Sequence, residues 1–355
     1  MAPPLTAPSE AVVLDALRAV RDPDLNQDIV ALGFVKDLRI CGGTVAFAIE
    51  LTTPACPVKD LMKSQAERAV RALAGVNDVA IEMTARVTAS RPVLGNKGVI
   101  PGVKNVLAVS SGKGGVGKST VAVNLACALQ RTGARVGILD ADVYGPNVPL
   151  MLGLKGQPAV DANKKIVPFE RHGLQVMSMA LLVADDQPVI WRGPMLHSAV
   201  RQFLFDVAWN DLDYLVVDLP PGTGDAQLSL SQQAHLMGAV IVTTPQDVSV
   251  LDVKKAIRMF QTVNVPILGV VENMAWFTPP GSNERYLLFG QGGGASIERE
   301  FGVPLLGQIP IEIEVREGGD SGKPIVLAAP DSASAKALAA VAGKVAQRVS
   351  ILNAE

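Results

Sequence analysis

Aromatic and charged residues are both scarce in this chain, and each shortage excludes a class of function. Aromatic residues make up 4% of its 355 positions, too few for a surface that stacks nucleic-acid bases. Charged residues make up 19%, and the net charge of -2 provides no overall attraction to nucleic acid or anionic lipid. We therefore expect no nucleic-acid partner and no membrane partner, and any polyanion must be bound by a local site.

Cysteine is equally scarce. Cys41, Cys56 and Cys127 are an odd number spread over a long chain, which is poor material for a disulfide framework. The N-terminal MAPPLTAPSE lacks the basic start and apolar run of a signal peptide, and the longest uncharged stretch, Ala226 to Gln246, is interrupted by polar side chains. We expect reduced thiols, no transmembrane segment and a cytoplasmic location.

The hydrophobic residues, 48% of the chain, are enough to fill the cores of about two domains. Residues 1–89 mix two helical patterns, at 9–20 and 58–73, with β-like runs at 34–40, 44–51 and 79–83. They predict a small α+β domain in which Gly42 and Gly43 turn a hairpin. Residues 90–104 hold three glycines and two prolines without apolar periodicity, which predicts a linker.

Residues 105–355 form the second predicted domain. Short apolar runs alternate with helical segments, from Val106 to Ser110 through to Leu305 to Gln308. This alternation predicts an α/β fold with a doubly wound, mostly parallel sheet, whose ligands bind at the carboxyl ends of the strands.

A glycine-rich segment after the first of these runs carries the strongest chemical signal. GKGGVGKST fits the pattern G-x-x-x-x-G-K-[ST] and lies between the apolar NVLAVSS and the helical VAVNLACALQ. Backbone N–H groups of such a P-loop converge on phosphate oxygens, and the helix dipole adds to the attraction. The predicted nucleotide-binding residues are Gly112, Lys113, Gly114, Gly115, Val116, Gly117, Lys118, Ser119 and Thr120. Lys118 is expected to reach the β- and γ-phosphates and Ser119 to ligate Mg²⁺; the alternative is an ordinary strand-to-helix turn.

Three aspartates end apolar strands in the same predicted domain. Asp140 and Asp142 follow VGIL, and Asp218 closes YLVVD. A carboxylate beside bound phosphates can hold Mg²⁺ or position the attacking water. We expect Asp218 to serve the metal and Asp142 the water, with Asp140 the weaker candidate. Capping of the following loop or helix is the alternative for all three. Gly222, Thr223 and Gly224 are expected to make the loop after Asp218 mobile.

The second lysine of the P-loop, Lys113, makes GKGGVGKST resemble the deviant Walker A signature of the MinD/ParA class of P-loop ATPases. In that class the extra lysine reaches the partner's nucleotide, so the resemblance implies a homodimer with ATP at its interface. It also implies that Asp142 is the switch I aspartate and that Asn273, in GVVENM, contacts adenine. The alternatives are a solvated loop lysine and a turn-forming asparagine.

Longer motifs indicate a branch of that class. DADVYGPNVP, WRGPML, DYLVVDLPPGTGD, TTPQD and VENM occur in the order found in Mrp/ApbC-type ATPases, which are iron–sulfur cluster carriers. DPDLNQDIVALGFV and LTTPACPVK resemble the small domain of iron–sulfur assembly proteins that is often fused ahead of this ATPase. The resemblance implies a Mg²⁺-dependent, ATP-hydrolysing homodimer that delivers iron–sulfur clusters to apoproteins, with assembly factors as further partners.

The chain departs from that family at the cluster site. The best-studied carriers hold a bridging cluster with a C-x-x-C pair after the VENM segment, whereas residues 275–290 contain no cysteine. Four aromatic residues stand there instead, which suggests either an apolar dimer or partner surface or packing within the domain: Trp276, Phe277, Tyr286 and Phe289.

Cys56 is then the candidate cluster ligand among the three thiols. It matches the motif cysteine of the small domain, and Lys59 and a helix start lie just behind it, features that lower a thiol pKa. The alternative is a loop cysteine that merely packs. Cys127 is expected to pack and Cys41 to be either exposed or packed. The competing function is a nucleotide-switched scaffold or positioning ATPase without a cluster of its own.

Overall fold

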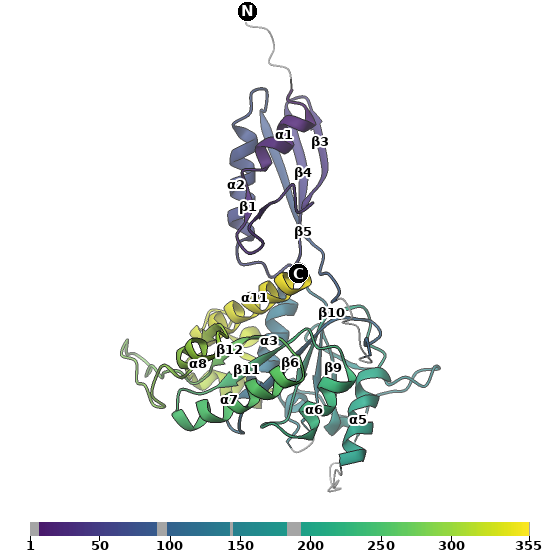
Figure 1. Cartoon of the computed structure of the whole chain (residues 1–355), viewed down its shortest axis with the longest axis vertical. Coiled ribbons are helices and arrows are strands. Elements are labelled where there is room, and N and C mark those ends of the chain that lie inside the picture. Colours follow the sequence, from purple (N-terminus) through teal and green to yellow (C-terminus); the bar gives the residue numbers. More distant parts are fainter. Residues whose placement is uncertain (1–6, 91–97, 143–144, 183–192, 355) are drawn as a thin grey trace, which may run out of the picture. The chain divides into compact units, whose positions relative to one another are not determined.

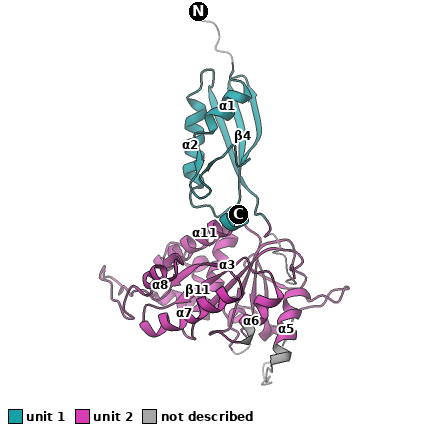
Figure 2. Cartoon of the chain, in the orientation of Figure 1, with its two compact units in different colours: residues 1–88, 350–355 teal, residues 89–349 magenta. Residues whose placement is uncertain are grey.

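The computed structural model describes residues 7–90, 98–142, 145–182 and 193–354, and the chain divides into two compact units (Figures 1 and 2). Unit 1 comprises residues 1–88 and 350–355, and unit 2 comprises residues 89–349. The predicted linker, residues 90–104, falls at the start of unit 2, and its residues 91–97 lie outside the described residues.

Unit 1 is a three-stranded sheet with two helices packed beside it. Its elements are α1 (Glu10–Leu17), β1 (Arg21–Asp22), β2 (Gln27–Asp28), β3 (Val35–Cys41), β4 (Thr44–Leu51), α2 (Lys59–Arg71) and β5 (Asp78–Ala85). The order is β3-β4-β5, with β3 and β4 antiparallel and β4 and β5 parallel. Gly42 and Gly43 have positive φ, which glycine adopts readily, so the predicted hairpin is confirmed. Met62 and Val70 of α2 are buried in this unit's core, which α1 and the sheet complete.

Unit 2 is built on an eight-stranded sheet. Its strands are β6 (Val103–Ser111), β7 (Val136–Asp140), β8 (Phe169–Arg171), β9 (Leu174–Ser178), β10 (Leu212–Asp218), β11 (Gly238–Thr243), β12 (Ile267–Glu272) and β13 (Leu305–Gln308). The order is β13-β12-β11-β6-β10-β7-β9-β8. Every neighbouring pair is parallel except β8 with β9, which confirms the predicted mostly parallel sheet. The edge strand β8 was not predicted.

Helices cover both faces of this sheet (Figure 1). They are α3 (Lys118–Arg131), α4 (Val148–Met151), the 3-10 helix η1 (Met179–Leu182), α5 (Gly193–Phe205), α6 (Asp225–Gln233), α7 (Asp247–Thr262), α8 (Gly293–Phe301), α9 (Ile313–Asp320), α10 (Ile325–Ala328) and α11 (Ala333–Ala354). None of the described helices combines the length and apolar character that a membrane span requires.

The direction in which successive strands are added to this sheet reverses at one point, beside β6. The chain leaves β6 for β7, which lies beyond β10, and later returns to β11 on the other side of β6. Ligands of open α/β sheets bind where the strand order reverses in this way. The carboxyl ends of β6, β7 and β10 meet at this edge. The predicted phosphate loop follows β6, Asp140 and Asp218 are the last residues of β7 and β10, and Asp142 lies in the loop after β7.

Candidate functional site

The P-loop connects the end of β6 to the first residue of α3. Gly115 and Gly117 have φ of 80° and 83°, a left-handed backbone that glycine adopts without strain. A Cβ at Gly112 would lie 2.3 Å from the carbonyl carbon of Asp252 in α7, so the loop approaches that helix more closely than a side chain permits. Two different needs, backbone conformation and close approach, therefore require glycine here.

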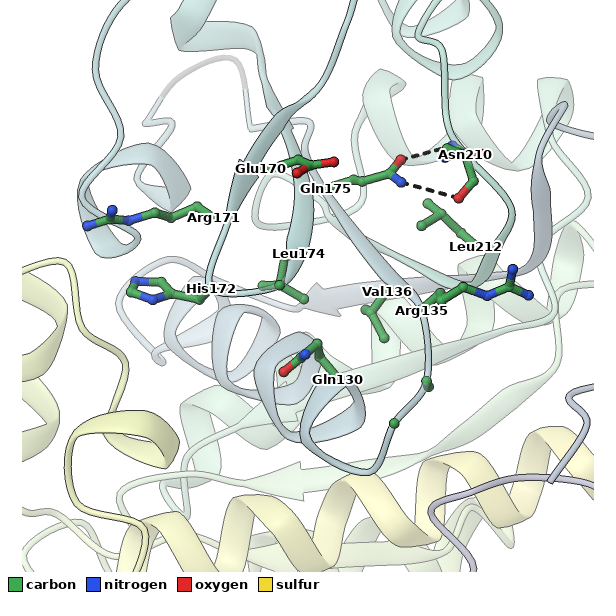
Figure 3. A pocket seen from close by; sticks show the side chains of 13 residues that line it. Gln130, Arg135, Val136, Glu170, Arg171, His172, Leu174, Gln175, Asn210 and Leu212 are labelled. Atoms are coloured by element: carbon green, nitrogen blue, oxygen red, sulfur yellow. Dashed lines mark hydrogen bonds between the residues drawn. The ribbon is translucent and has the colours of Figure 1, made fainter. Parts of the chain in front are cut away.

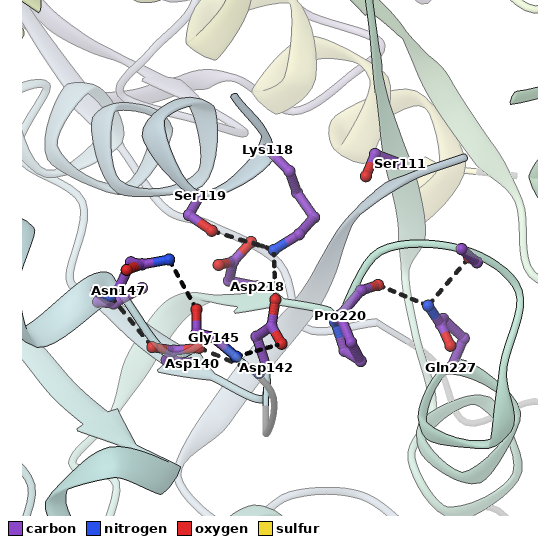
Figure 4. Close-up of polar contacts among 12 residues, drawn as sticks. Ser111, Lys118, Ser119, Asp140, Asp142, Gly145, Asn147, Asp218, Pro220 and Gln227 are labelled. Carbon is purple, nitrogen blue, oxygen red and sulfur yellow. Dashed lines mark hydrogen bonds and ion pairs between the residues drawn. The ribbon is translucent and has the colours of Figure 1, made fainter. Parts of the chain in front are cut away.

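Lys118, the first residue of α3, lies buried among carboxylates (Figure 4). Its Nζ donates to Oδ1 of Asp218 at 2.6 Å and lies 3.7 Å from Oδ2 of Asp142. It also donates to the hydroxyl of Ser119 at 3.1 Å. The structure thus brings together four of the sequence-predicted site residues, drawn from α3 and from the ends of β7 and β10.

Asp218 has one oxygen committed to Lys118 and one that is not. Its Oδ2 is buried and has no hydrogen-bond partner among the described residues. Burial raises the pKa of Asp218, while the charge and hydrogen bond of Lys118 oppose that rise. A buried carboxylate oxygen left without a donor is costly, and a cation or a cation-bound water would satisfy it.

These donors fit Mg²⁺. Mg²⁺ keeps several waters and is held by one or two protein oxygens together with substrate phosphates, and Ser119 and Asp218 supply such oxygens. Within the described parts of the chain, no group of three or more His, Cys, Asp or Glu side chains is arranged to hold a metal ion. The two oxygens of Ser119 and Asp218 fit a metal whose remaining ligands are phosphates and waters.

Asp140 is a capping residue for the backbone that follows β7. Its Oδ1 accepts from the N–H of Asp142 at 3.1 Å, and its Oδ2 accepts from the N–H of Val148 and the hydroxyl of Ser178, both at 3.1 Å. Burial, with the nearby charge of Asp218, raises the pKa of Asp140 to about 8. The capping alternative fits Asp140, which ties the β7 end, the α4 start and β9 together.

Asp142 lies one step further along the same loop. Its Oδ1 accepts from the N–H of Gly145 at 3.2 Å, and its Oδ2 faces Lys118. Residues 143 and 144, between Asp142 and Gly145, lie outside the described residues. Asp142 is therefore held at the phosphate end of the site while keeping a carboxylate oxygen directed towards the lysine.

The loop after Asp218 is held by a residue that the sequence analysis missed. Gln227 of α6 is buried, and its Nε2 donates to the carbonyls of Pro220 at 2.6 Å and Gly222 at 3.0 Å (Figure 4). The N–H of Gly222 in turn donates to the carbonyl of Ser111 at 2.9 Å, so this loop is joined to the P-loop strand. The only sequence signal was a polar residue on the first turn of a helix. Of the WRGPML motif, Trp191 and Arg192 lie outside the described residues.

Asn273 follows β12 and contacts the P-loop directly. Its Nδ2 donates to the carbonyl of Val116 at 2.9 Å. A Cβ at Gly117 would lie 2.2 Å from that nitrogen, so the asparagine needs the glycine. Met274, the next residue, has a φ of 57°, which is uncommon for a side chain of its size. The predicted contact with adenine is compatible with this position and stays a prediction.

Lys113 and Thr120 complete the predicted loop. Lys113 is half-buried and makes no ion pair with any residue that the structure describes; its carbonyl accepts from the hydroxyl of Ser111 at 2.9 Å. The carbonyl of Thr120 accepts from Nδ2 of Asn124 at 2.9 Å, within α3. The ammonium of Lys113 is thus available to a group outside its own chain.

Cys56 belongs to unit 1, in the loop before α2. It is half-buried, and burial raises its pKa, as do the charges of Asp22 and Asp24; the N–H groups of Val58 and Lys59 oppose the rise but are outweighed. The expectation of a lowered thiol pKa is wrong, because burial and two acidic neighbours prevail over the helix start. Its predicted role as a cluster ligand stays a prediction.

The other two cysteines behave more simply. Cys127 is buried in α3, and burial raises its pKa to about 12, so the prediction that it packs is confirmed. Cys41, at the end of β3, is exposed.

A cavity of about 600 Å³ lies away from this site, near the amino ends of β7 and β9. Val136, Leu174 and Leu212 line it, and Gln175 and Asn210 exchange two hydrogen bonds at its edge (Figure 3). None of the sequence-predicted site residues lines this cavity.

Comparison with known proteins gives two family matches that together cover most of the chain. Residues 102–346 match the family described as NUBPL iron-transfer P-loop NTPase, and residues 10–83 match the family described as iron-sulfur cluster assembly protein. These matches bear out the resemblance carried by the motifs.

The individual proteins that this chain resembles have names consistent with the family matches. An iron-sulfur cluster carrier protein from Synechocystis is 53% identical over 96% of this chain and 97% of its own length. A protein of the same name from Deinococcus radiodurans is 52% identical over 96% and 95%. Among solved structures, a nucleotide-binding protein from Archaeoglobus fulgidus in complex with ADP is 40% identical, with a TM-score of 0.58, over 66% of this chain and 91% of its own.

Proposed function

This chain belongs to the NUBPL iron-transfer P-loop NTPase family, and from that membership we propose that it is a Mg²⁺-dependent ATPase that carries iron–sulfur clusters to apoproteins. The ATPase part of this proposal rests on one observation. Lys118, Asp142 and Asp218 lie close together at the carboxyl edge of the sheet, beside the P-loop. We place the activity in the cytoplasm.

Each of these residues has a task in hydrolysis. The loop N–H groups and the α3 dipole bind the phosphates, and Lys118 exchanges its carboxylate partners for phosphate oxygens. Mg²⁺, held by Ser119 and Asp218, would neutralise charge on the phosphates. Asp142 orients the attacking water by accepting its hydrogen bond, and loss of the γ-phosphate releases the loops after Asp142 and Asp218.

Lys113, which forms no ion pair with the residues that the structure describes, supports a homodimer. A cation supplied in trans stabilises charge on the transferring phosphoryl group, as an arginine finger does. Each protomer would then complete the other's site, and the nucleotide state would set the geometry of the dimer.

The cluster is cargo in this proposal, and Cys56 is its candidate ligand. Cluster irons need thiolates, and Cys127 is buried in α3. The raised pKa of Cys56 does not prevent ligation, because metal binding itself displaces the thiol proton. Two copies of Cys56, or one copy and an external thiol, would have to share the cluster. Apoproteins and assembly factors are the partners of this exchange.

Anaerobic reconstitution with iron and sulfide tests the proposal. After desalting, iron, sulfide and visible absorbance are counted per dimer for the native protein, for Cys56→Ser and for the control Cys41→Ser. We expect stable binding that is lost in Cys56→Ser and kept in Cys41→Ser. An absence of binding by the native protein, with hydrolysis intact, would favour the nucleotide-switched scaffold instead.

A further inference from the structure

A fully buried glutamate ends β12, immediately before Asn273. Both carboxylate oxygens of Glu272 accept hydrogen bonds: Oε2 from the N–H of Gly294 and Oε1 from Nε2 of Gln308, each at 2.6 Å. Neither donor carries a charge. Burying a carboxylate without a cation beside it is costly, so these two short bonds hold a costly group in one position at the end of the strand.

The first of these bonds caps a helix that lacks a cap of its own. The N-cap of α8 is Gly292, which offers no side-chain hydrogen bond. The carboxylate of Glu272 reaches the N–H of Gly294 from outside the helix instead. A negative charge is favourable at this end of a helix, where N–H groups lack intrahelical partners. Glu272 therefore anchors the start of α8 to the end of β12.

The second bond reaches the chain that borders Asn273. Gln308 is the last residue of β13. The next residue, Ile309, donates its N–H to the carbonyl of Glu272 and accepts from the N–H of Ala275, both at 2.9 Å. The backbone on either side of Asn273 thus depends on the position of β13, and the Glu272 carboxylate holds β13 at its last residue.

The side chain of Asn273 has a fixed orientation. Its Nδ2 donates to the carbonyl of Val116 at 2.9 Å. Because a carbonyl oxygen can only accept, the NH₂ group must face it, and Oδ1 is an acceptor directed away from Val116. The 6-amino group of adenine donates to such an acceptor, whereas the 6-oxo group of guanine is itself an acceptor. At a purine base, this orientation favours a 6-aminopurine over a 6-oxopurine.

We propose that Glu272 is a positioning residue for base selection: by holding α8 and β13 to β12, it fixes the Asn273 acceptor that selects a 6-aminopurine nucleotide. The inference rests on the proposed function, because the phosphates of that nucleotide must lie in the P-loop while its base reaches Asn273. Glu272 acts through Asn273 and contacts no nucleotide itself. Its effect therefore falls on nucleotide affinity and selectivity, and the groups that act on the phosphates, such as Lys118, are left in place.

Steady-state hydrolysis of ATP and of GTP by the full chain, with Mg²⁺, tests the proposal. In Glu272→Ala we expect the KM for ATP to rise about tenfold while kcat changes less than about threefold, and the preference for ATP over GTP in kcat/KM to fall by a similar factor. Glu272→Gln should bring the KM back to within about threefold of native, because its amide accepts from Gly294 and donates to Gln308 once the Gln308 amide turns over.

The matched control is Glu298→Ala. This carboxylate, on α8, also accepts from a backbone N–H, that of Leu305 at the opposite end of β13 from Gln308, at 3.2 Å. We expect its KM for ATP to stay within about twofold of native. A merely structural role of Glu272 predicts another pattern, because partial unfolding lowers the active fraction and hence the apparent kcat but leaves the KM unchanged.

A double-mutant cycle tests whether Glu272 acts through Asn273. Glu272→Ala combined with Asn273→Ala should raise the KM no further than Asn273→Ala alone, whereas independent effects multiply. If Glu272→Ala does not fold, Gln308→Ala serves in its place: it removes one of the two donors from an exposed position and should raise the KM about threefold.

The outcomes separate this inference from the proposed function. Native protein that hydrolyses neither nucleotide overturns both. Native protein that hydrolyses ATP, with an unchanged KM in Glu272→Ala and Gln308→Ala or with independent effects in the cycle, overturns the positioning role while the hydrolytic site stands. Equal kcat/KM for ATP and GTP in the native protein refutes the selection of a 6-aminopurine.

Discussion

Nζ of Lys118 lies 2.6 Å from Oδ1 of Asp218, and both side chains are buried. This pair joins the first residue of α3 to the last residue of β10, two positions 100 residues apart in sequence. It keeps the phosphate-binding cation at the carboxyl edge of the sheet. A second lysine–aspartate pair joins β10 to its neighbour β6 at the opposite, amino end of these strands, where Nζ of Lys104 lies 2.8 Å from Oδ1 of Asp213.

Lys104→Met is the matched control for Lys118→Met, because each variant removes the lysine of a lysine–aspartate pair in unit 2. We expect Lys118→Met to reduce ATP hydrolysis about a hundredfold or more, because the cation that meets the phosphates is gone. Lys104→Met removes an ion pair between β6 and β10 at the end of these strands away from the P-loop, and hydrolysis is expected to stay within about twofold. Phosphate release and nucleotide affinity are measured for both. Normal turnover by Lys118→Met would refute the site.

Lys113→Ala separates the two lysines of the loop. If Lys113 acts on the nucleotide of the other protomer, its removal lowers kcat about tenfold or more, while nucleotide affinity of the monomer changes less than about threefold. Lys155→Ala, a surface lysine of the same unit, serves as the control. Unchanged turnover in Lys113→Ala would show that this residue is a solvated loop lysine.

Asp140 predicts a pH dependence of stability. Its pKa is about 8 in the folded protein and about 3.9 in an unfolded chain. Between these values the folded state binds more protons than the unfolded state, so this group makes the free energy of unfolding fall as pH rises from about 4 to 8. Its contribution is present below that window and lost above it.

Asp140→Asn removes the titration, so we expect its free energy of unfolding to fall less steeply between pH 5 and pH 8 than that of the native protein. All three tryptophans, at positions 191, 209 and 276, belong to unit 2, so their fluorescence during urea unfolding follows that unit. Asp331→Asn, at an exposed carboxylate, is the control and should keep the native slope. Parallel slopes for Asp140→Asn and the native protein would mean that Asp140 is ionised throughout.

The three thiols are expected to alkylate in a fixed order. Cys41 is exposed and reacts first; Cys56 reacts more slowly because burial and two aspartates disfavour its thiolate; Cys127 reacts only on unfolding. Iodoacetamide labelling at pH 7.5, followed by peptide mass analysis with and without urea, measures the order. Labelling of Cys56 ahead of Cys41 would contradict this order and would support the lowered thiol pKa that the sequence analysis predicts for Cys56.

The sequence determined the fold class, the P-loop and the family, because each depends on local signals. Near-continuous apolar strands alternating with helical periods specify a parallel sheet, and GKGGVGKST specifies a loop whose glycines are required by its backbone. The edge strand β8 was missed because three residues carry little periodicity and its pairing with β9 depends on a turn at His172 and Gly173, both with positive φ.

Tertiary structure alone decided which polar groups meet. No local pattern relates Asp140 to Ser178 or Asn273 to Val116, since strand order brings each of these pairs together. Gln227 meets the carbonyl of Pro220 through the path of the loop between β10 and α6, which no sequence pattern specifies. The Cys56 pKa was misjudged for the same reason, because burial and the approach of Asp22 and Asp24 are properties of the packed unit. The sequence identifies the side chains that could take part in the chemistry of the site. Their protonation and their hydrogen-bond partners depend on distances and burial that only the folded structure determines.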